Sequence, residues 1–263
     1  MNNLESPIPN LDELVEYFIK YILPLKAKIL QMKYQLVITG CIGSGKTTVI
    51  NKLFKLFEEF QPIAVREYLE ANKKLGPIIL SEFINQTITP LTTQNAILDI
   101  YENQLKSLIN PDLKGIILYE RIPDDNLTVF TNLAFKNKDL TDDEFKVLYS
   151  RTLKIDQKYN IPSYICKNSK FKKIVSTDLV DRIIIILDTI KDDVEKGINS
   201  RIIGLSTDLE SCKIRIQRRH REDEDKYSDE YLNNIIKTYN KIYSLIDNND
   251  YEITLFNIGQ FIE

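Results

Sequence analysis

A glycine-rich turn limits what this chain can fold into more than any other feature of its sequence. Residues 40–47 fit the pattern G-x-x-x-x-G-K-[ST]. A short apolar and β-branched run at residues 34–39 predicts a buried strand before the turn, and residues 46–60 predict a helix after it. A strand, a glycine-rich loop and a helix in this order form a phosphate-binding P-loop. The sequence therefore predicts an α/β fold that binds a nucleoside triphosphate.

Each part of this loop has a chemical task. Backbone N–H groups that curl around phosphate oxygens need glycine, and the following helix N-terminus adds positive potential. Lys46 can reach the β- and γ-phosphates, and the Thr47 hydroxyl can ligate Mg²⁺. We therefore assign ATP binding to nine consecutive residues, which are Gly40, Cys41, Ile42, Gly43, Ser44, Gly45, Lys46, Thr47 and Thr48.

The rest of the chain alternates between short apolar runs and helical patterns. Strands are expected at residues 63–65, 115–119, 201–205 and 251–256, with helices at 95–108, 127–135, 210–217 and 228–246. This alternation predicts a parallel five-stranded sheet flanked by helices. Residues 138–199 show no clear pattern, and the run at 182–188 fits either a strand or a turn of buried helix.

We expect residues 34–263 to form one kinase domain, preceded by a tail and a helix in residues 1–33. Apolar residues between positions 11 and 23 recur at three- and four-residue spacing, which predicts one apolar stripe on that helix. The stripe either covers the core or binds a partner. Pro24 is expected to kink or end the helix.

Charge and cysteine content exclude several classes of protein. Thirty-five Lys and Arg residues against 38 Asp and Glu give a net charge of −3, which does not favour nucleic acid or an anionic membrane as a partner. The apolar runs are too short for a membrane span. Three cysteines and one histidine lack metal-type spacing, so we expect neither a disulfide framework nor a zinc site. The expected location is the cytoplasm.

Carboxylates follow two of the expected strands. Glu67 comes after residues 63–65, and Glu120 with Arg121 comes after residues 115–119. Ligands of open α/β sheets bind at the carboxyl ends of the strands, where Glu67 can accept a proton from an attacking hydroxyl. Arg121 can neutralise a transferring phosphoryl group, and Glu120 can hold Mg²⁺ together with Thr47. No Asn-Lys-x-Asp motif occurs, so a kinase for a small acceptor is favoured over a GTPase.

A basic cluster near the C-terminal end predicts a mobile lid over the phosphates. It contains Arg215, Arg219 and Arg221 and lies directly before a run of acids at residues 222–225. A nucleic-acid patch is the rival interpretation, but the adjacent acids and the negative net charge weaken it.

From residue 34 onward the chain resembles the deoxynucleoside kinase family. In that family a Glu-x-Cys motif is followed by lid arginines three, seven and nine residues after the Cys and by a Glu twelve residues after it. Glu210-Ser211-Cys212 and the residues that follow satisfy all four offsets, with Arg215, Arg219, Arg221 and Glu224. The resemblance implies ATP and Mg²⁺ as cofactors, a homodimer, and a deoxynucleoside as the small-molecule substrate.

The resemblance also implies roles for individual residues. Glu67 would be the base for the 5′-hydroxyl, Gln94 would read the base edge, Phe130 would stack on the base, and Glu224 would contact the sugar 3′-hydroxyl. Lys46, Arg121 and Arg215 would complete the catalytic set. The substrate-binding set is then Glu67, Phe83, Gln94, Tyr101, Arg121, Asn126, Phe130 and Glu224.

The chain departs from the family at several of these positions. Phe83 stands where the family has a Tyr that touches the 3′-hydroxyl, Ile122 replaces a Ser, and Thr93 replaces an aromatic residue. Tyr101 and Asn126 stand where deoxycytidine-preferring relatives carry an Arg–Asp pair. Residues 158–188 are interpreted as an insertion.

Because this pocket lacks a charged reader, we expect a pyrimidine deoxynucleoside kinase with thymidine among its good substrates. A thymidylate-type monophosphate kinase is the main alternative, since Arg66-Glu67 is similar to its Arg-Glu-Pro motif. A non-catalytic nucleotide-binding protein is the third. Transfer of phosphate from labelled ATP to a nucleoside or a monophosphate separates all three.

Overall fold

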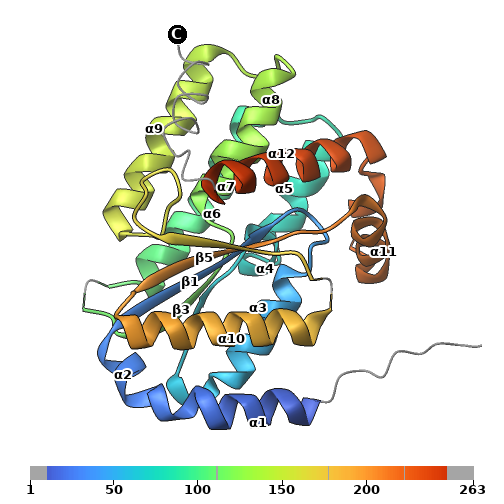
Figure 1. Ribbon diagram of the computed structural model, residues 1–263. Helices are drawn as coiled ribbons and strands as arrows, with labels where there is room; N and C mark the ends of the chain where they lie inside the picture. The colour runs from blue at the N-terminus through green and yellow to red at the C-terminus, as the bar shows by residue number, and fades with distance from the viewer. Residues whose placement is uncertain (1–10, 111, 177, 222, 248–263) are drawn as a thin grey trace, which may run out of the picture.

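A sheet of five parallel strands forms the centre of the computed structural model, which describes residues 11–110, 112–176, 178–221 and 223–247 (Figure 1). The strand order is β2-β3-β1-β5-β4. The strands are β1 (Lys33–Gly40), β2 (Ile63–Val65), β3 (Gly115–Glu120), β4 (Lys170–Ile174) and β5 (Ser200–Leu205). Every neighbouring pair is parallel. The predicted α/β fold with a parallel five-stranded sheet is confirmed.

The register of the sheet brings the chemistry-bearing residues to one edge. Ile38 in β1 pairs with Glu120 in β3, and Val65 in β2 pairs with Tyr119. β1, β2 and β3 therefore end at nearly the same level. The P-loop, Glu67 and Arg121 follow these ends directly, so the sheet delivers them to one place.

Helices cover both faces of the sheet (Figure 1). One layer contains α1 (Leu11–Tyr21), α2 (Lys26–Gln31), α3 (Lys46–Leu56) and α10 (Leu179–Lys196). The other contains α6 (Pro90–Leu108), α9 (Asp142–Tyr159) and α12 (Asp229–Asp247). Successive residues of β1 point to opposite faces of the sheet. Leu36 and Ile38 pack in the core under the first layer of helices, and Val37 packs in the core under the second. A strand buried on both faces explains the continuous apolar run.

Shorter helices build the edge where the strands end. On the side of β2 these are α4 (Tyr68–Ala71) and α5 (Leu75–Ile84), and after β3 follow α7 (Pro123–Asp125), a π-helical turn (Asn126–Thr131) and α8 (Asn132–Lys136). After β5 comes α11 (Leu209–Arg219). Three 3₁₀ turns complete the described elements, at Leu23–Leu25, Glu58–Phe60 and Glu224–Lys226.

Four of the five expected strands agree with β1, β2, β3 and β5, whereas the expected strand at 251–256 lies outside the described residues. The fifth strand is β4, in a range whose sequence showed no clear pattern. The ambiguous run at 182–188 is helical and belongs to α10. Asp178 fixes the start of that helix because its carboxylate accepts hydrogen bonds from the amides of Val180 and Asp181.

Residues 158–188 contribute directly to the sheet and to one of its layers. They supply β4, which pairs with β5, and the first half of α10, whose Ile183 and Ile186 are fully buried. Within this structure the segment is an integral part of the core. Its status as an insertion relative to the family stays a prediction, as does the domain boundary before residue 34.

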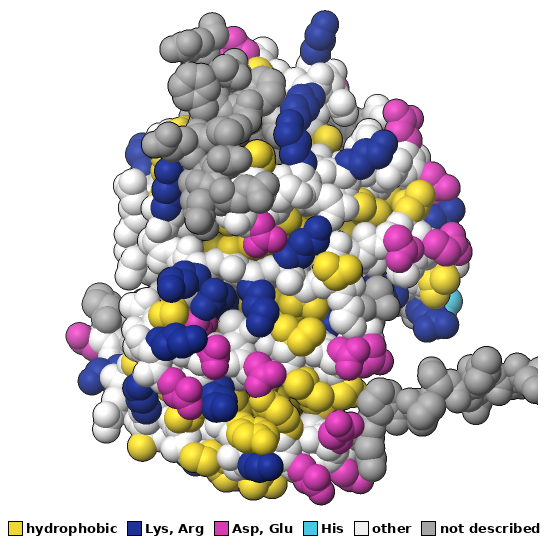
Figure 2. Space-filling view, in the orientation of Figure 1, with side chains coloured by type: hydrophobic (Ala, Val, Ile, Leu, Met, Phe, Trp, Pro, Cys, Tyr) yellow, Lys and Arg dark blue, Asp and Glu magenta, His cyan; other side chains and the backbone are white. Residues whose placement is uncertain are grey.

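The N-terminal helix α1 packs against the core. Leu14, Phe18 and Ile22 are buried there, and the Phe18 ring meets the Phe57 ring edge-on, with centroids 5.1 Å apart. The helix ends at Tyr21, before the 3₁₀ turn that contains Pro24. Val15 and Ile19 remain partly exposed on its outer side, where Figure 2 shows hydrophobic side chains gathered at the lower end of the molecule. None of the described helices combines the length and the apolar character that crossing a membrane requires.

Candidate active site

The P-loop takes the backbone shape that its glycines allow. Gly40, Gly43 and Gly45 all have positive φ, and Gly43 lies tightly against α11. A Cβ atom on Gly43 would come within 2.7 Å of the Cys212 carbonyl oxygen and 2.9 Å of its sulfur. A side chain at this position would therefore collide with α11, so glycine is required both by the backbone angle and by close packing.

Neighbouring segments hold this loop from several sides. Arg215 of α11 donates to the Gly43 carbonyl over 3.2 Å. Arg182 of α10 donates to the Ser44 carbonyl over 2.6 Å and to the Ser206 carbonyl over 2.9 Å. The sequence did not identify Arg182 as a site residue, because it lies in the range without a clear pattern. Arg182 holds the P-loop through its hydrogen bond to Ser44, which lies 138 positions earlier in the sequence.

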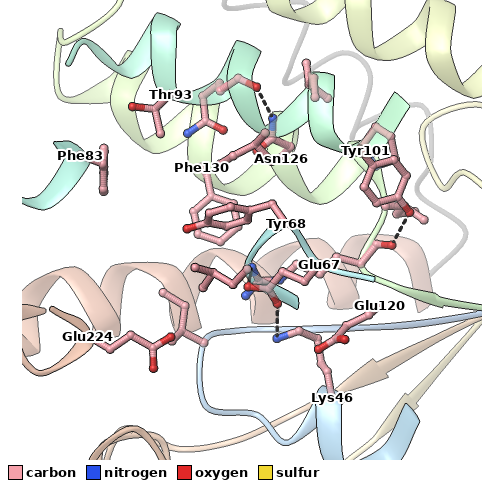
Figure 3. Close-up of a pocket in the computed structure, with 18 of the residues that line it drawn as sticks. Lys46, Glu67, Tyr68, Phe83, Thr93, Tyr101, Glu120, Asn126, Phe130 and Glu224 are labelled. Atoms are coloured by element: carbon pink, nitrogen blue, oxygen red, sulfur yellow. Dashed lines mark hydrogen bonds and ion pairs between the residues drawn. The ribbon is translucent and has the colours of Figure 1, made fainter. Parts of the chain in front are cut away.

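Lys46, Glu67 and Arg121 form a buried charge cluster beside the loop. Figure 3 shows the ion pair between Lys46 and Glu67. Glu67 Oε2 lies 3.8 Å from Lys46 Nζ, and Glu67 Oε1 lies 3.2 Å from Arg121 Nη1. Lys46 also donates to the Cys41 carbonyl over 3.0 Å. Three of the four side chains predicted to drive catalysis thus meet at one point, where the single carboxylate of Glu67 is shared by two cations in the ligand-free protein.

The cluster shifts the pKa values of its members. Burial alone would raise the pKa of Glu67, but the charges of Arg121 and Lys46 outweigh burial and hold it at about 2. Burial, followed by repulsion from Arg121, lowers the pKa of Lys46 to about 8. Glu67 is therefore fully ionised at neutral pH, and any anion that draws the cations away will make it more basic.

The two candidate metal ligands lie in direct contact. The Thr47 hydroxyl donates to Glu120 Oε1, while Glu120 Oε2 is buried without a hydrogen-bond partner among the described residues and lies 3.6 Å from Arg66 Nη1. Burial, and then the charge of Glu67, raise the pKa of Glu120. A hydroxyl and a carboxylate oxygen beside a phosphate loop suit Mg²⁺, which prefers hard oxygen ligands. The residues fit the ion.

A pocket extends from this charge cluster. The eight residues expected to bind the nucleoside all line it, namely Glu67, Phe83, Gln94, Tyr101, Arg121, Asn126, Phe130 and Glu224. The π-helical turn after α7 carries Asn126 and Phe130, and α6 carries Gln94 and Tyr101. The structure therefore brings the predicted substrate residues together, although their roles stay predictions.

Two of these residues are engaged within the protein. The Tyr101 hydroxyl donates to the Arg121 carbonyl over 2.8 Å, and the Asn126 amide donates to the Gln94 carbonyl over 3.5 Å. Arg121 has a positive φ of 65° and lies over the Phe130 ring at 5.0 Å. Tyr101 thus supports the strained backbone of Arg121.

Two arginines of the expected lid pair with carboxylates, and one of them, Arg219, lines the pocket. Arg219 lies 3.0 Å from Glu224, and Arg221 contacts both Glu224, at 3.3 Å, and Glu70 of α4. Glu224 is only 2% exposed. The pair between Arg221 and Glu70 joins the segment after α11 to α4, which is the arrangement expected of a lid. The movement of the lid stays a prediction.

Three tyrosines on the pocket wall were missed by the sequence analysis as site residues. Tyr68 follows Glu67 directly, while Tyr227 and Tyr231 lie three and seven residues after Glu224. Because they lie close in sequence to Glu67 and Glu224, two expected site carboxylates, their place on the pocket wall could have been predicted.

Comparison with known proteins agrees with this geometry. Residues 36–165 match the family model described as deoxynucleoside kinase. No curated protein matches the sequence. Among solved structures, deoxyadenosine kinase from M. mycoides with bound dATP is 16% identical, with a TM-score of 0.52, over 83% of this chain and 86% of that one. The structure of the same enzyme with products dCMP and a flexible dCDP is also 16% identical, with a TM-score of 0.53, over 80% of this chain and 83% of that one. At this identity the structural likeness shows the fold.

Proposed function

Because this chain belongs to the deoxynucleoside kinase family, we propose that it phosphorylates the 5′-hydroxyl of a pyrimidine deoxynucleoside, with thymidine among its good substrates. The observation that carries the pyrimidine proposal is the state of Gln94. Its side chain is buried, and its Oε1 atom has no hydrogen-bond partner among the described residues. A buried polar atom left unpaired costs about 1–3 kcal/mol, so a base edge that pairs with it gains selectivity.

The chemistry of the amide explains why both pyrimidines fit. Gln94 offers an acceptor and a donor side by side, which matches the N3–C4 edge of thymine, or of cytosine after the amide flips. Two other side chains of the pocket are uncharged: Tyr101 turns its hydroxyl to a backbone carbonyl, and Asn126 is an amide. Phe130 supplies an aromatic surface for stacking. No charged group in this set favours cytosine over thymine.

The charge cluster supports in-line phosphoryl transfer from ATP. Glu67 would take the proton of the 5′-hydroxyl while that oxygen attacks the γ-phosphorus and the bond to ADP breaks. Lys46, Arg121 and the lid arginines, including Arg215, would neutralise the phosphates. Mg²⁺ held by Thr47 and Glu120 would add positive charge at the β- and γ-phosphates.

Binding of ATP would also activate the base. In the ligand-free protein Glu67 is the counter-ion of Lys46 and Arg121, at 3.8 and 3.2 Å. A γ-phosphate arriving at the loop competes for both cations and so weakens the electrostatic hold that keeps the pKa of Glu67 at about 2. Glu67 then becomes a better proton acceptor only when the donor is in place.

A second candidate substrate is deoxyadenosine. The structural neighbours are named deoxyadenosine kinases, and the base end of the pocket adjoins a second open cleft that shares Gln94 and Phe130 with it. A cleft at that end offers room for a larger base.

The deciding measurement is kcat/KM for thymidine, deoxycytidine, deoxyadenosine and deoxyguanosine with ATP. The proposal expects both pyrimidines to exceed both purines. A purine preference above about tenfold, which corresponds to roughly 1.4 kcal/mol, would overturn it. Phosphorylation of dTMP in place of thymidine would identify the monophosphate-kinase alternative. Light scattering of the purified protein tests the proposed homodimer, and fractionation of cells tests the proposed cytoplasmic location.

A further inference from the structure

We propose that the buried carboxylate of Asp125 positions Arg121 and the first residues of the P-loop relative to each other. This inference rests on the proposed phosphoryl transfer, because it concerns the backbone that carries two parts of that site. Asp125 is the last residue of α7, and its side chain is only 1% exposed. It is not among the described residues that line the pocket, so it can affect the reaction only through other residues.

The first argument is a closed ring of contacts around this carboxylate. Asp125 Oδ2 accepts a hydrogen bond from the Ile122 amide over 3.2 Å, and Oδ1 accepts one from the Thr39 hydroxyl over 2.5 Å. Ile122 directly follows Arg121, and Thr39 directly precedes Gly40. The Arg121 guanidinium donates to the Gly40 carbonyl over 3.4 Å and so closes the ring. One carboxylate therefore links the backbone after β3 to the end of β1, where the P-loop begins.

The second argument is the backbone conformation of Arg121. Its φ of 65° lies in the left-handed region, which persists in a residue with a side chain only where the surroundings enforce it. The Arg121 amide donates to the Ile38 carbonyl over 3.0 Å, and Tyr101 donates to the Arg121 carbonyl. The next amide, that of Ile122, is held by Asp125. Because Ile122 has no polar side-chain atom that could cap α7, the carboxylate of Asp125 supplies the hold on this side of Arg121.

The third argument is that the hydrogen-bond partners of this carboxylate all donate to it. Besides Thr39 and Ile122, the Tyr164 hydroxyl donates to Oδ1 over 3.4 Å. An ionised carboxylate only accepts hydrogen bonds, so it matches this set of donors. A protonated Asp125 would bring its own O–H donor among them, and one of these contacts would be lost or reversed. The ring is therefore complete only while Asp125 is ionised.

The surroundings bring the ionisation of Asp125 close to neutral pH. Burial raises its pKa to about 6, although the hydrogen bond from Thr39 and the charge of Arg121 act in the opposite direction. The other titratable groups that face it are Asp124 on α7, Tyr101 on α6, Tyr164 before β4, and Tyr239 and Tyr243 on α12. The pKa of each of these tyrosines and that of Arg121 are raised, so these groups keep their protons around pH 6. Burial also raises the pKa of Asp124, so the test must separate the two carboxylates.

The first test measures kcat against pH at saturating ATP and deoxynucleoside. In the wild type, kcat should fall with an apparent pKa of about 6 as the pH is lowered, because protonation opens the ring. Asp125→Asn keeps the size of the side chain but removes its charge. Its kcat at pH 8 should be about five- to tenfold below that of the wild type, because a charged acceptor binds its donors more strongly than a neutral one. The inflection near pH 6 should disappear in this variant.

Two further readouts distinguish positioning from a general structural role. The KM of Asp125→Asn for the deoxynucleoside should stay within about twofold of the wild type, because Asp125 does not line the pocket. Its Tm at pH 8 should not fall, because Asn avoids the burial of a charge that raises the pKa of Asp125. A loss of turnover without a loss of stability is the expected mark of a positioning residue.

The second test changes the donor and leaves the carboxylate in place. Thr39→Val removes the hydrogen bond that favours ionised Asp125, so the pKa of Asp125 should rise and the inflection of kcat should move up by about one pH unit. Thr39→Ser keeps the hydroxyl and is the matched control, in which the inflection should stay in place. Because the Thr39 hydroxyl bonds to Asp125, an upward shift assigns the inflection to this carboxylate rather than to Asp124.

The outcomes separate the inference from the proposed function. A wild type that phosphorylates no deoxynucleoside refutes the proposed function; amide exchange at Ile122 then decides the inference, since it should be faster in Asp125→Asn than in the wild type at pH 8, and an equal rate overturns it. With activity present, a flat wild-type profile between pH 5 and 7, an unchanged inflection in Asp125→Asn, or equal inflections in Thr39→Val and Thr39→Ser would each overturn the role of Asp125. The Thr39 variants keep the test decisive if Asp125→Asn does not fold.

Discussion

Replacing Glu67 by Gln should nearly abolish turnover while ATP still binds. The amide keeps the size of the side chain but cannot take the proton of the 5′-hydroxyl. General-base catalysis contributes about 10²- to 10⁴-fold, so kcat at saturating ATP and deoxynucleoside should fall by that factor. ATP affinity, measured by calorimetry, should stay within a few fold. A kcat within about threefold of the wild type would refute Glu67 as the base.

The same substitution should destabilise the ligand-free protein. A shift of the Glu67 pKa from 4.5 to about 2 corresponds to roughly 3 kcal/mol of stabilisation of its charged form. The side chain is 13% exposed, so solvent screening is limited. Gln lacks this charge and leaves Lys46 and Arg121 without a counter-ion, so the free energy of unfolding at pH 7 should drop by about that amount.

The stabilisation by ionised Glu67 depends on pH. Because the folded-state pKa of Glu67 is depressed, its stabilisation is complete above pH 4.5 and is lost as the pH falls toward 2. The stability difference between wild type and Glu67→Gln should therefore shrink below pH 4.5. Glu59→Gln, which breaks the exposed pair with Lys26 at 3.1 Å, is the matched control and should change stability by less than about 1 kcal/mol. Equal stabilities of wild type and Glu67→Gln at pH 7 would contradict the argument.

Three other perturbations test different parts of the structure. Gly43→Ala should weaken ATP binding at least tenfold in calorimetry, because the new Cβ would lie 2.7 Å from the Cys212 carbonyl oxygen and displace α11 from the loop. An unchanged ATP affinity would show that α11 can shift at no cost to the site. Amide exchange across residues 213–227 should slow when ATP and a deoxynucleoside are both bound, and an unchanged rate would count against a closing lid. Asp156→Asn should match wild-type stability below pH 3.8 and exceed it at pH 8, measured by urea unfolding. Burial, and then the charge of Asp124, raise the folded-state pKa of Asp156. The wild type therefore loses stability as the pH rises above the unfolded pKa of 3.8. A variant that is less stable than the wild type by more than about 2 kcal/mol at pH 8 would refute this.

Local patterns were sufficient to predict the centre of the fold. Strands β1, β3 and β5 are buried on both faces, so each one is a short apolar run that can be recognised without knowing its neighbours. The rule that ligands bind at the carboxyl ends of parallel strands then predicted that the P-loop, Glu67 and Glu120 would meet, and they do.

The parts that were missed depend on contacts between distant residues. β4 lies at the edge of the sheet and carries three lysines, so no apolar alternation marks it. The isoleucine run of α10 is rich in β-branched residues, and its helical state follows from packing on the sheet and from the Asp178 cap. Arg182 acquires its role from a P-loop carbonyl that is far away in the sequence.

The P-loop is held by residues that lie far after it in the sequence, and this affects when the site forms during synthesis of the chain. A nascent chain that has reached residue 165, where the matched family region ends, already contains the loop and the Glu67 carboxylate. It still lacks Arg182, β5 and Arg215, which hold the loop on the other side. Because these contacts come from residues that follow the matched region, the phosphate site is complete only after they have been synthesised. Nucleotide bound to the complete site can therefore stabilise the chain only from that stage of translation onward.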